Sequence, residues 1–146
     1  MIRVLIVDDY APWRRFIATS LASKQEIALV DEAKDGLTGI QKAMELQPDL
    51  VVLDMSLPDL SGIEIARKIR ESVPKAKILF LTENSSQDIV RKALSTGAEG
   101  YVVKSRAARD LIPAVENLLL GKTFISSSVG GNSSFFNPLC MTLIFN

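Results

Sequence analysis

The chain has 146 residues, of which 47% are hydrophobic and 23% are charged, the composition of one globular domain with a buried core. Its 17 basic and 17 acidic residues balance, so net charge provides no general attraction to nucleic acid or to membranes. The absence of histidine excludes Ser-His and Cys-His catalysis, His-ligated zinc and a phosphohistidine carrier. The only cysteine, Cys140, excludes an intramolecular disulfide and is typical of a cytoplasmic protein.

The first half of the chain alternates predicted strands and helices. Residues 2–7 form a continuously apolar, β-branched run, the pattern of a strand that is covered on both faces. Apolar side chains then recur at helical spacing: Trp13, Phe16, Ile17 and Leu21. A second strand is predicted at 27–33, and Asp35 is the predicted N-cap of a helix that ends before Pro48. The third strand is predicted at 50–54.

The same alternation continues in the second half. Ser61, followed three residues later by Glu64, forms a capping box that predicts the start of the third helix. A fourth strand is predicted at 77–82, and Ser85 is the predicted N-cap of the fourth helix. A short fifth strand is predicted at 101–104.

Pro113 makes the start of the last helix ambiguous. A helix that begins at Arg106 would contain Pro113, whose ring removes an intrahelical hydrogen bond. With Asp110 as the N-cap, Pro113 falls in the first turn, where proline is tolerated. We therefore expect a late-starting or kinked helix that stops at Gly121.

The alternation of short strands and helices predicts an α/β fold with a parallel sheet and helices on both faces. In such sheets, ligands bind beyond the carboxyl ends of the strands. Polar side chains stand at the ends of four of the predicted strands: Asp8, Asp9, Asp54, Thr82 and Lys104. We therefore expect these side chains to meet at one edge of the sheet.

This group of side chains indicates phosphoryl transfer. Asp8, Asp9 and Asp54 would bring roughly three negative charges together, and their repulsion is relieved by a hard divalent cation such as Mg²⁺. Lys104 offers a mobile positive charge for a phosphoryl group, and the Thr82 hydroxyl can donate to a phosphate oxygen. An aspartate beside a bound metal ion can act as a nucleophile that forms an acyl phosphate.

Four segments, in this order and spacing, resemble the receiver domain of two-component response regulators: VLIVDD, LVVLDMSLPDLSG, ILFLT and GYVVKS. The resemblance covers about residues 2–121. The stretches LPDLSGIE and GAEGYVVKS are most similar to the NarL/LuxR type, in which a helix-turn-helix DNA-binding domain follows the receiver. The resemblance implies a flavodoxin-like (βα)5 fold, with five parallel strands in the order 2-1-3-4-5.

The resemblance implies that Asp54 accepts a phosphoryl group from a sensor histidine kinase in a step that needs Mg²⁺. Asp8, Asp9 and Asp54 would hold the metal ion together with the backbone carbonyl of Ser56. The protein would then be a phosphoacceptor, with at most slow self-dephosphorylation, rather than an enzyme.

The resemblance also implies a conformational switch. Lys104 would bind a phosphoryl oxygen, Thr82 would close on the phosphoryl group, and the Tyr101 ring would rotate inward to fill the vacated space. This change would remodel the face formed by the fourth helix, the fifth strand and the fifth helix. A second copy of the chain or an effector would bind that face, and the output would be regulation of transcription.

Two other functions fit part of the pattern. A phosphatase of the haloacid-dehalogenase type also forms an aspartyl phosphate, but it needs a second aspartate where this chain has Ser56. A receiver-shaped interaction module that is never phosphorylated would have the same fold. Taken alone, Asp8 and Asp9 would fit capping residues of a turn. Glu83, next to Thr82, adds a negative charge near the site that would weaken phosphate affinity or alter hydrolysis.

Lys122 is the last charged residue, and we divide the chain into a receiver domain at 1–121 and a linker with an uncharged tail at 122–146. The stretch SSSVGGNSS is typical of a flexible linker, and FFNPLCMTLIFN of an edge strand or aggregation-prone segment. The tail is either a truncated or altered C-terminus or a segment that docks on the domain or on a second subunit. Because no basic helical domain follows, we expect no direct binding of nucleic acid by this chain. No apolar run approaches the ~20 residues that span a bilayer, so no membrane association is expected.

Overall fold

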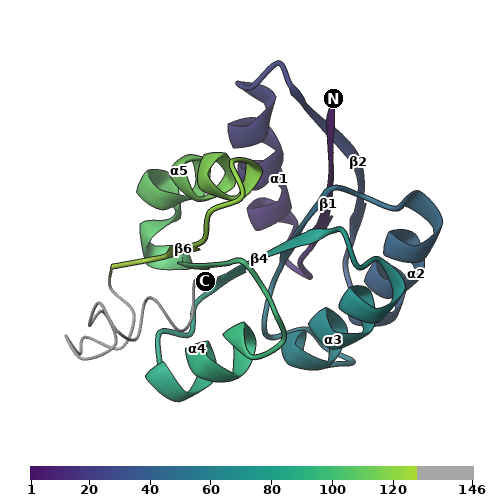
Figure 1. The fold of residues 1–146 in the computed structure, drawn as a ribbon, viewed down its shortest axis with the longest axis vertical. Helices are drawn as coiled ribbons and strands as arrows, with labels where there is room; N and C mark the ends of the chain where they lie inside the picture. Colours follow the sequence, from purple (N-terminus) through teal and green to yellow (C-terminus); the bar gives the residue numbers. More distant parts are fainter. Residues whose placement is uncertain (128–146) are drawn as a thin grey trace.

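The computed structural model describes residues 1–127, which form an α/β fold built on one sheet (Figure 1). Neighbouring strands pair in parallel in the order β2-β1-β3-β4-β5-β6. The strands are β1 (Ile2–Val7), β2 (Ile27–Ala33), β3 (Leu50–Leu53), β4 (Lys77–Thr82), β5 (Gly100–Val103) and β6 (Phe124–Ile125). The helices are α1 (Ala11–Ala22), α2 (Gly36–Leu46), α3 (Gly62–Ser72), α4 (Gln87–Leu94) and α5 (Ala107–Leu119). The predicted order of the first five strands is confirmed, and β6 extends it.

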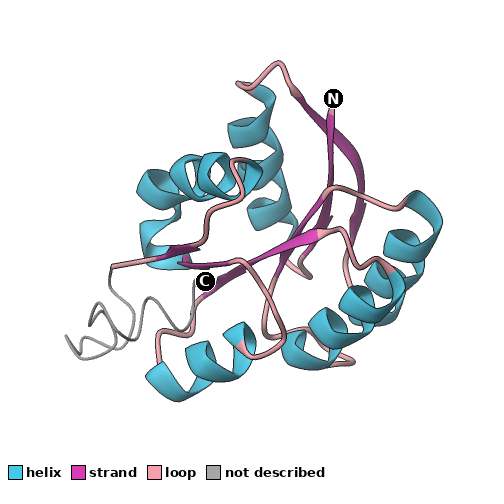
Figure 2. Cartoon of the chain, in the orientation of Figure 1, coloured by secondary structure: helices cyan, strands magenta, loops and turns pink. Residues whose placement is uncertain are grey.

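The helices form two layers, one on each face of the sheet (Figure 2). Helices α1 and α5 cover one face, and α2, α3 and α4 cover the other. Alternate residues of β1 divide between the two cores: Val4 and Ile6 pack with α1 and α5, whereas Leu5 and Val7 pack with the other three helices. All four side chains are fully buried, which explains why β1 is continuously apolar.

Two of the predicted helix caps are confirmed. At the start of α2, the Asp35 side chain accepts a hydrogen bond of 2.8 Å from the backbone N–H of Thr38. At the start of α3, the Ser61 hydroxyl accepts one of 3.3 Å from the backbone N–H of Glu64. Each cap satisfies an N–H group that has no partner within its own helix.

The start of α4 differs from the prediction by one residue. The N-cap is Ser86 and not Ser85. The Asn84 side chain accepts a hydrogen bond of 2.9 Å from the backbone N–H of Ser86. This bond closes a turn around Ser85, which therefore lies before the helix.

Of the two starts that the sequence left open for the last helix, the late start with Asp110 as the N-cap is wrong. Helix α5 begins at Ala107, directly after a 3₁₀ turn, η1 (Lys104–Arg106), and Pro113 lies inside the helix. One face of α5 is apolar and buried: Ala107, Leu111, Ala114, Val115 and Leu118. Burial of this face outweighs the single hydrogen bond that Pro113 removes.

Strand β6 and the residue after it are absent from the sequence prediction. β6 pairs in parallel with the first half of β5. The fully buried Ser126 hydroxyl donates a hydrogen bond of 2.8 Å to Asp110 Oδ2 and accepts one of 3.1 Å from the backbone N–H of Val103. Residues 124–126 therefore pack on both β5 and α5.

Most predictions for the linker and tail lie outside the described residues. Residues 128–146, which hold Cys140 and the stretch FFNPLCMTLIFN, are not described, and the expectations for this tail lie outside the structure. Within residues 1–127, no helix combines the length and apolar character that crossing a bilayer requires.

Candidate functional site

Three carboxylates meet at the carboxyl edge of the sheet. Asp8 directly follows β1, with Asp9 next to it, and Asp54 directly follows the neighbouring strand β3. Each offers a carboxylate oxygen, and these oxygens lie within 4.8 Å of one another. Asp8 is 1% exposed and Asp54 is 6% exposed, whereas Asp9 is open to solvent. The structure therefore brings together the three carboxylates that the sequence pattern singled out.

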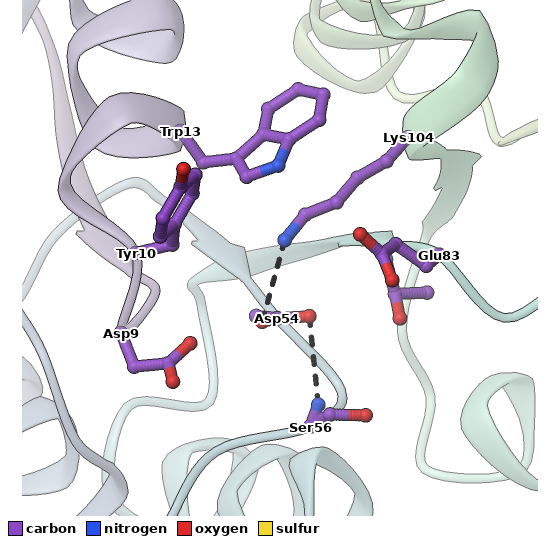
Figure 3. Close-up of a pocket in the computed structure, with 8 residues that line it drawn as sticks. Asp9, Tyr10, Trp13, Asp54, Ser56, Glu83 and Lys104 are labelled. Carbon is purple, nitrogen blue, oxygen red and sulfur yellow. Dashed lines mark hydrogen bonds and ion pairs between the residues drawn. The ribbon is translucent and has the colours of Figure 1, made fainter.

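A pocket of about 420 Å³ lies at this edge. Five of the predicted site residues line it: Asp9, Asp54, Ser56, Thr82 and Lys104. Figure 3 shows the Asp54 carboxylate in the middle of the site, with the Lys104 ammonium above it and Ser56 below it.

Backbone and side-chain donors orient the two buried carboxylates. Asp8 Oδ1 accepts a hydrogen bond of 2.9 Å from the backbone N–H of Tyr10. Arg14, on α1, donates a hydrogen bond of 2.7 Å to the backbone carbonyl of Asp8. Asp54 Oδ1 accepts a long hydrogen bond of 3.5 Å from the backbone N–H of Ser56 (Figure 3). The Asp54 side chain is thus held more loosely than the Asp8 side chain.

Lys104 brings a positive charge to the carboxylates. Its ammonium nitrogen Nζ is 2.9 Å from Asp8 Oδ2 and 3.4 Å from Asp54 Oδ2. The lysine side chain is only 7% exposed, so solvent screens these ion pairs weakly. Among the described residues, Asp8 Oδ2 accepts no directed hydrogen bond, and its contact with Lys104 is purely an ion pair. One lysine faces three carboxylates, and the group stays net negative.

The pKa of the Asp54 carboxyl group is raised above its ordinary value. Burial is the largest cause, and the negative charge of Asp8 acts in the same direction. The Lys104 ammonium and the Ser56 N–H group lower the pKa and offset part of this rise. Additional positive charge in the pocket would therefore favour the ionised carboxylate, which is the nucleophilic form.

The donor set fits Mg²⁺. This ion prefers oxygen ligands and keeps several of its waters, and the three carboxylates supply oxygens at one edge of an open pocket. Asp8 Oδ2 is buried and accepts no directed hydrogen bond, and a metal ion at this oxygen would displace its ion pair with Lys104. The exposed Asp9 borders solvent, which leaves room for the retained waters.

The loop that carries Asp54 packs closely on the start of α3. The backbone N–H of Gly62 donates a hydrogen bond of 2.8 Å to the carbonyl of Met55. A Cβ atom at Gly62 would lie 2.7 Å from Met55 Cα and 2.8 Å from the Asp54 carbonyl oxygen, closer than real Cβ contacts. Glycine at this position therefore allows the loop that carries Asp54 to pack this closely on the start of α3.

The two predicted switch residues meet at Asn84. Thr82 ends β4, is buried and lines the pocket, and its Oγ1 accepts a long hydrogen bond of 3.4 Å from the backbone N–H of Asn84. Tyr101, on β5, is fully buried, and its ring packs on Phe80 with 6.0 Å between the centroids. The Tyr101 hydroxyl donates a hydrogen bond of 2.6 Å to the backbone carbonyl of Asn84.

The family model described as the response regulator receiver domain matches residues 4–116. The chain belongs to this family. Its relatives include the response regulator protein VraR of Staphylococcus saprophyticus, which is 34% identical over 128 residues, or 88% of this chain. This receiver chain spans 59% of the length of that VraR protein.

Solved receiver structures have the same fold. A two-component response regulator of the LuxR family from Aurantimonas sp. SI85-9A1 has a TM-score of 0.85 and 32% identity, covering 90% of this chain and 94% of that one. The isolated REC domain of RcsB from Salmonella enterica serovar Typhimurium, in the presence of the phosphomimetic BeF3−, has a TM-score of 0.84 and 29% identity. That likeness covers 89% of this receiver and 96% of the RcsB domain.

Sequence reasoning missed part of the pocket wall of this receiver. Tyr10 and Trp13 line the pocket, although the pattern placed Trp13 in the apolar stripe of α1. Their position in the sequence could have indicated this role. The first turn of α1 follows Asp8 and Asp9, so its residues border the same edge of the sheet. Glu83, whose charge was noted beside Thr82, also lines the pocket. Figure 3 shows the Trp13 ring next to the Lys104 side chain, with Tyr10 beside Trp13.

Proposed function

We propose that this receiver domain accepts a phosphoryl group from a histidine kinase on Asp54. The observation that carries the proposal is the Asp54 carboxylate itself, buried at the pocket with the Asp8 carboxylate and the Lys104 ammonium beside it. In the transfer, an Asp54 oxygen bonds to phosphorus and the bond from phosphorus to the donor nitrogen breaks, with the electron pair leaving on nitrogen. The product is an acyl phosphate on this chain.

Charge neutralisation is the main requirement of this step. Mg²⁺, held by the carboxylates of Asp8, Asp9 and Asp54 and the backbone carbonyl of Ser56, would neutralise charge on the phosphoryl oxygens. The Lys104 ammonium lies 2.9 Å from Asp8 on a flexible stem, and it can turn from that carboxylate to a phosphoryl oxygen. The Thr82 hydroxyl lines the same pocket and can donate a hydrogen bond to another phosphoryl oxygen.

Thr82 and Tyr101 would pass the change at Asp54 to the surface. Both side chains are hydrogen-bonded to the backbone of Asn84. Movement of Thr82 toward a phosphoryl group would therefore also move the loop to which Tyr101 is bonded. That loop leads into α4, and Tyr101 belongs to β5. The face of α4, β5 and α5 would then bind a second copy or an effector, with regulation of transcription as the output.

In this proposal, residues 1–121 are the receiver domain, and residues 122–146 are a linker with an uncharged tail. With this boundary, β6 belongs to the linker, and it pairs with β5 of the receiver domain. A cytoplasmic location, in keeping with the family, is part of the proposal.

A titration with beryllofluoride and Mg²⁺, followed by amide NMR, tests the proposal. Beryllofluoride mimics a phosphoryl group on aspartate, so we expect shifts at Asp54, Thr82 and Tyr101 and along α4 and β5. The matched control, Asp54→Asn, should show only the shifts that Mg²⁺ causes alone. Identical spectra for the native protein and this control would contradict the proposal and favour an interaction module that is not phosphorylated.

A further inference from the structure

The indole ring of Trp13 lies over the ammonium group of Lys104. The Lys104 Nζ atom is 5.0 Å from the ring centroid, within the ~6 Å over which an aromatic face attracts a cation. Figure 3 shows the indole ring above the end of the Lys104 side chain. The contact joins α1 to the turn after β5, two elements that are distant in the sequence.

Trp13 lies at the border between the core and the pocket: part of it packs against the core that α1 and α5 share. The buried residues of α1 are Ile17 and Leu21, whereas Trp13 is partly exposed and lines the pocket. Its ring meets the Phe16 ring edge-on, with 5.4 Å between centroids and 85° between planes. This contact sets the plane of the indole, so that its face is presented to Lys104.

Three groups surround the Lys104 ammonium: the carboxylates of Asp8 and Asp54 and the ring of Trp13. A divalent cation on the carboxylates competes with Lys104 for the same oxygens and repels its charge. The ring is neutral and is no ligand for a hard cation, so its attraction for the lysine persists. Trp13 is therefore the partner that Lys104 can keep when the carboxylates are occupied.

We propose that Trp13 is a positioning residue that holds the Lys104 ammonium at the pocket, and so sets how tightly the pocket holds a phosphoryl group. The inference rests on the proposed function of Asp54. Without the ring, the long side chain of Lys104 is free to rotate into solvent when its carboxylate partners are taken. Each time a phosphoryl group binds, the Lys104 side chain must then be ordered again, at a cost in conformational entropy.

The first test reads the contact itself. An aromatic face shifts nearby protons upfield, so the Lys104 ε-CH₂ resonance should lie upfield in the native protein and return to its ordinary position in Trp13→Leu. In the native protein the upfield shift should persist when Mg²⁺ is added. Loss of the shift on adding Mg²⁺ would overturn the inference, because the ring would then not hold the lysine in the metal-loaded state.

The second test measures the dissociation constant of beryllofluoride at saturating Mg²⁺ by ¹⁹F NMR. We expect Trp13→Leu to weaken binding by about threefold to thirtyfold, the range of a cation–π contact, and Trp13→Phe to recover most of the loss because it restores an aromatic face. Ile17→Val, a buried change on the same helix away from the pocket, controls for a general loosening of α1 and should leave the affinity unchanged.

The outcomes separate the inference from the function on which it rests. If native protein binds beryllofluoride and Trp13→Leu binds equally well, Trp13 has no positioning role. Equal weakening in Trp13→Leu and Trp13→Phe would also overturn the inference, because shape and not the aromatic face would then matter. If the native protein does not bind beryllofluoride at all, the proposed function of Asp54 fails first, and the inference falls with it.

Discussion

The Tyr101 hydroxyl donates a hydrogen bond of 2.6 Å to the backbone carbonyl of Asn84, two residues beyond Thr82. The Tyr101 ring is fully buried and packs beside Phe80. Burial, and to a smaller extent the charge of Asp54, raises the pKa of the Tyr101 phenol, so this hydroxyl stays a hydrogen-bond donor over the ordinary pH range. A buried hydrogen bond therefore connects the loop between β4 and α4 to β5.

Removing this hydroxyl should loosen the loop. We expect Tyr101→Phe to lower the free energy of unfolding by about 0.5–1.5 kcal/mol, the net value of one hydrogen bond, and to speed amide exchange around Asn84. Urea denaturation and hydrogen exchange measure both effects. Tyr10→Phe is the matched control: Tyr10 is 58% exposed, and its loss of a hydroxyl should leave the stability unchanged. Equal stability of Tyr101→Phe and native protein would show that the hydrogen bond has no net value.

Asp54 should make stability depend on pH in a direction that is unusual for an aspartate. Burial and the Asp8 charge raise its pKa in the folded state, so the ionised carboxylate opposes folding. This cost is absent in acid, where both states are protonated, and it grows as pH rises through the unfolded-state and then the folded-state pKa. We therefore expect Asp54→Asn to be more stable than native protein at pH 7 without divalent cations.

Urea denaturation in EDTA between about pH 4 and pH 7 measures this difference, which should shrink as pH falls. The exposed Asp9 provides the comparison, and Asp9→Asn should change stability less than Asp54→Asn at pH 7. A lower stability of Asp54→Asn at pH 7 would mean that its ion pair with Lys104 outweighs burial and repulsion.

Lys104→Met should destabilise the protein when no divalent cation is present. The change leaves two buried carboxylates, Asp8 and Asp54, without their cation, and we expect a loss of about 2–4 kcal/mol in EDTA. Mg²⁺ should recover part of the loss, because it takes over neutralisation of the same oxygens. Lys24→Met is the control: Lys24 pairs with Glu116 at an exposed position, and its loss should have little effect. A loss in Lys104→Met that Mg²⁺ does not reduce would argue against a shared carboxylate site.

Ser126→Ala should destabilise the packing of the segment that follows α5. The substitution leaves the backbone N–H of Val103 and the buried Asp110 carboxylate each without a hydrogen bond, and we expect a loss of about 1–3 kcal/mol. Thermal or urea unfolding measures the change, with the exposed neighbour Ser127→Ala as the control. If both variants are as stable as native protein, the Ser126 contacts do not hold this segment in place.

The sequence was sufficient to predict the sheet and the carboxylate cluster because both follow from periodic, local patterns. Asp8 and Asp54 follow apolar runs of parallel strands, and the carboxyl ends of such strands necessarily share an edge. The start of α5 was less predictable, because the local signal of Pro113 competes with burial of a whole helix face.

Two features of the structure depend on contacts that no local pattern encodes. Strand β6 has only two residues and no periodicity to detect, and it is held by the bond between Ser126 and Asp110. The Trp13 ring meets Lys104 only because α1 and the turn after β5 come together in space. In sequence, the spacing of Trp13 fits a core residue as well as it fits a pocket wall.

The most direct test of the central claim is the mass of the intact protein after incubation with a small acyl phosphate and Mg²⁺. We predict that one phosphoryl group is added, that the modified peptide contains Asp54, and that EDTA or Asp54→Asn abolishes the addition. No mass gain in the native protein, or an equal gain in Asp54→Asn, would contradict the assignment of Asp54 as the phosphoacceptor.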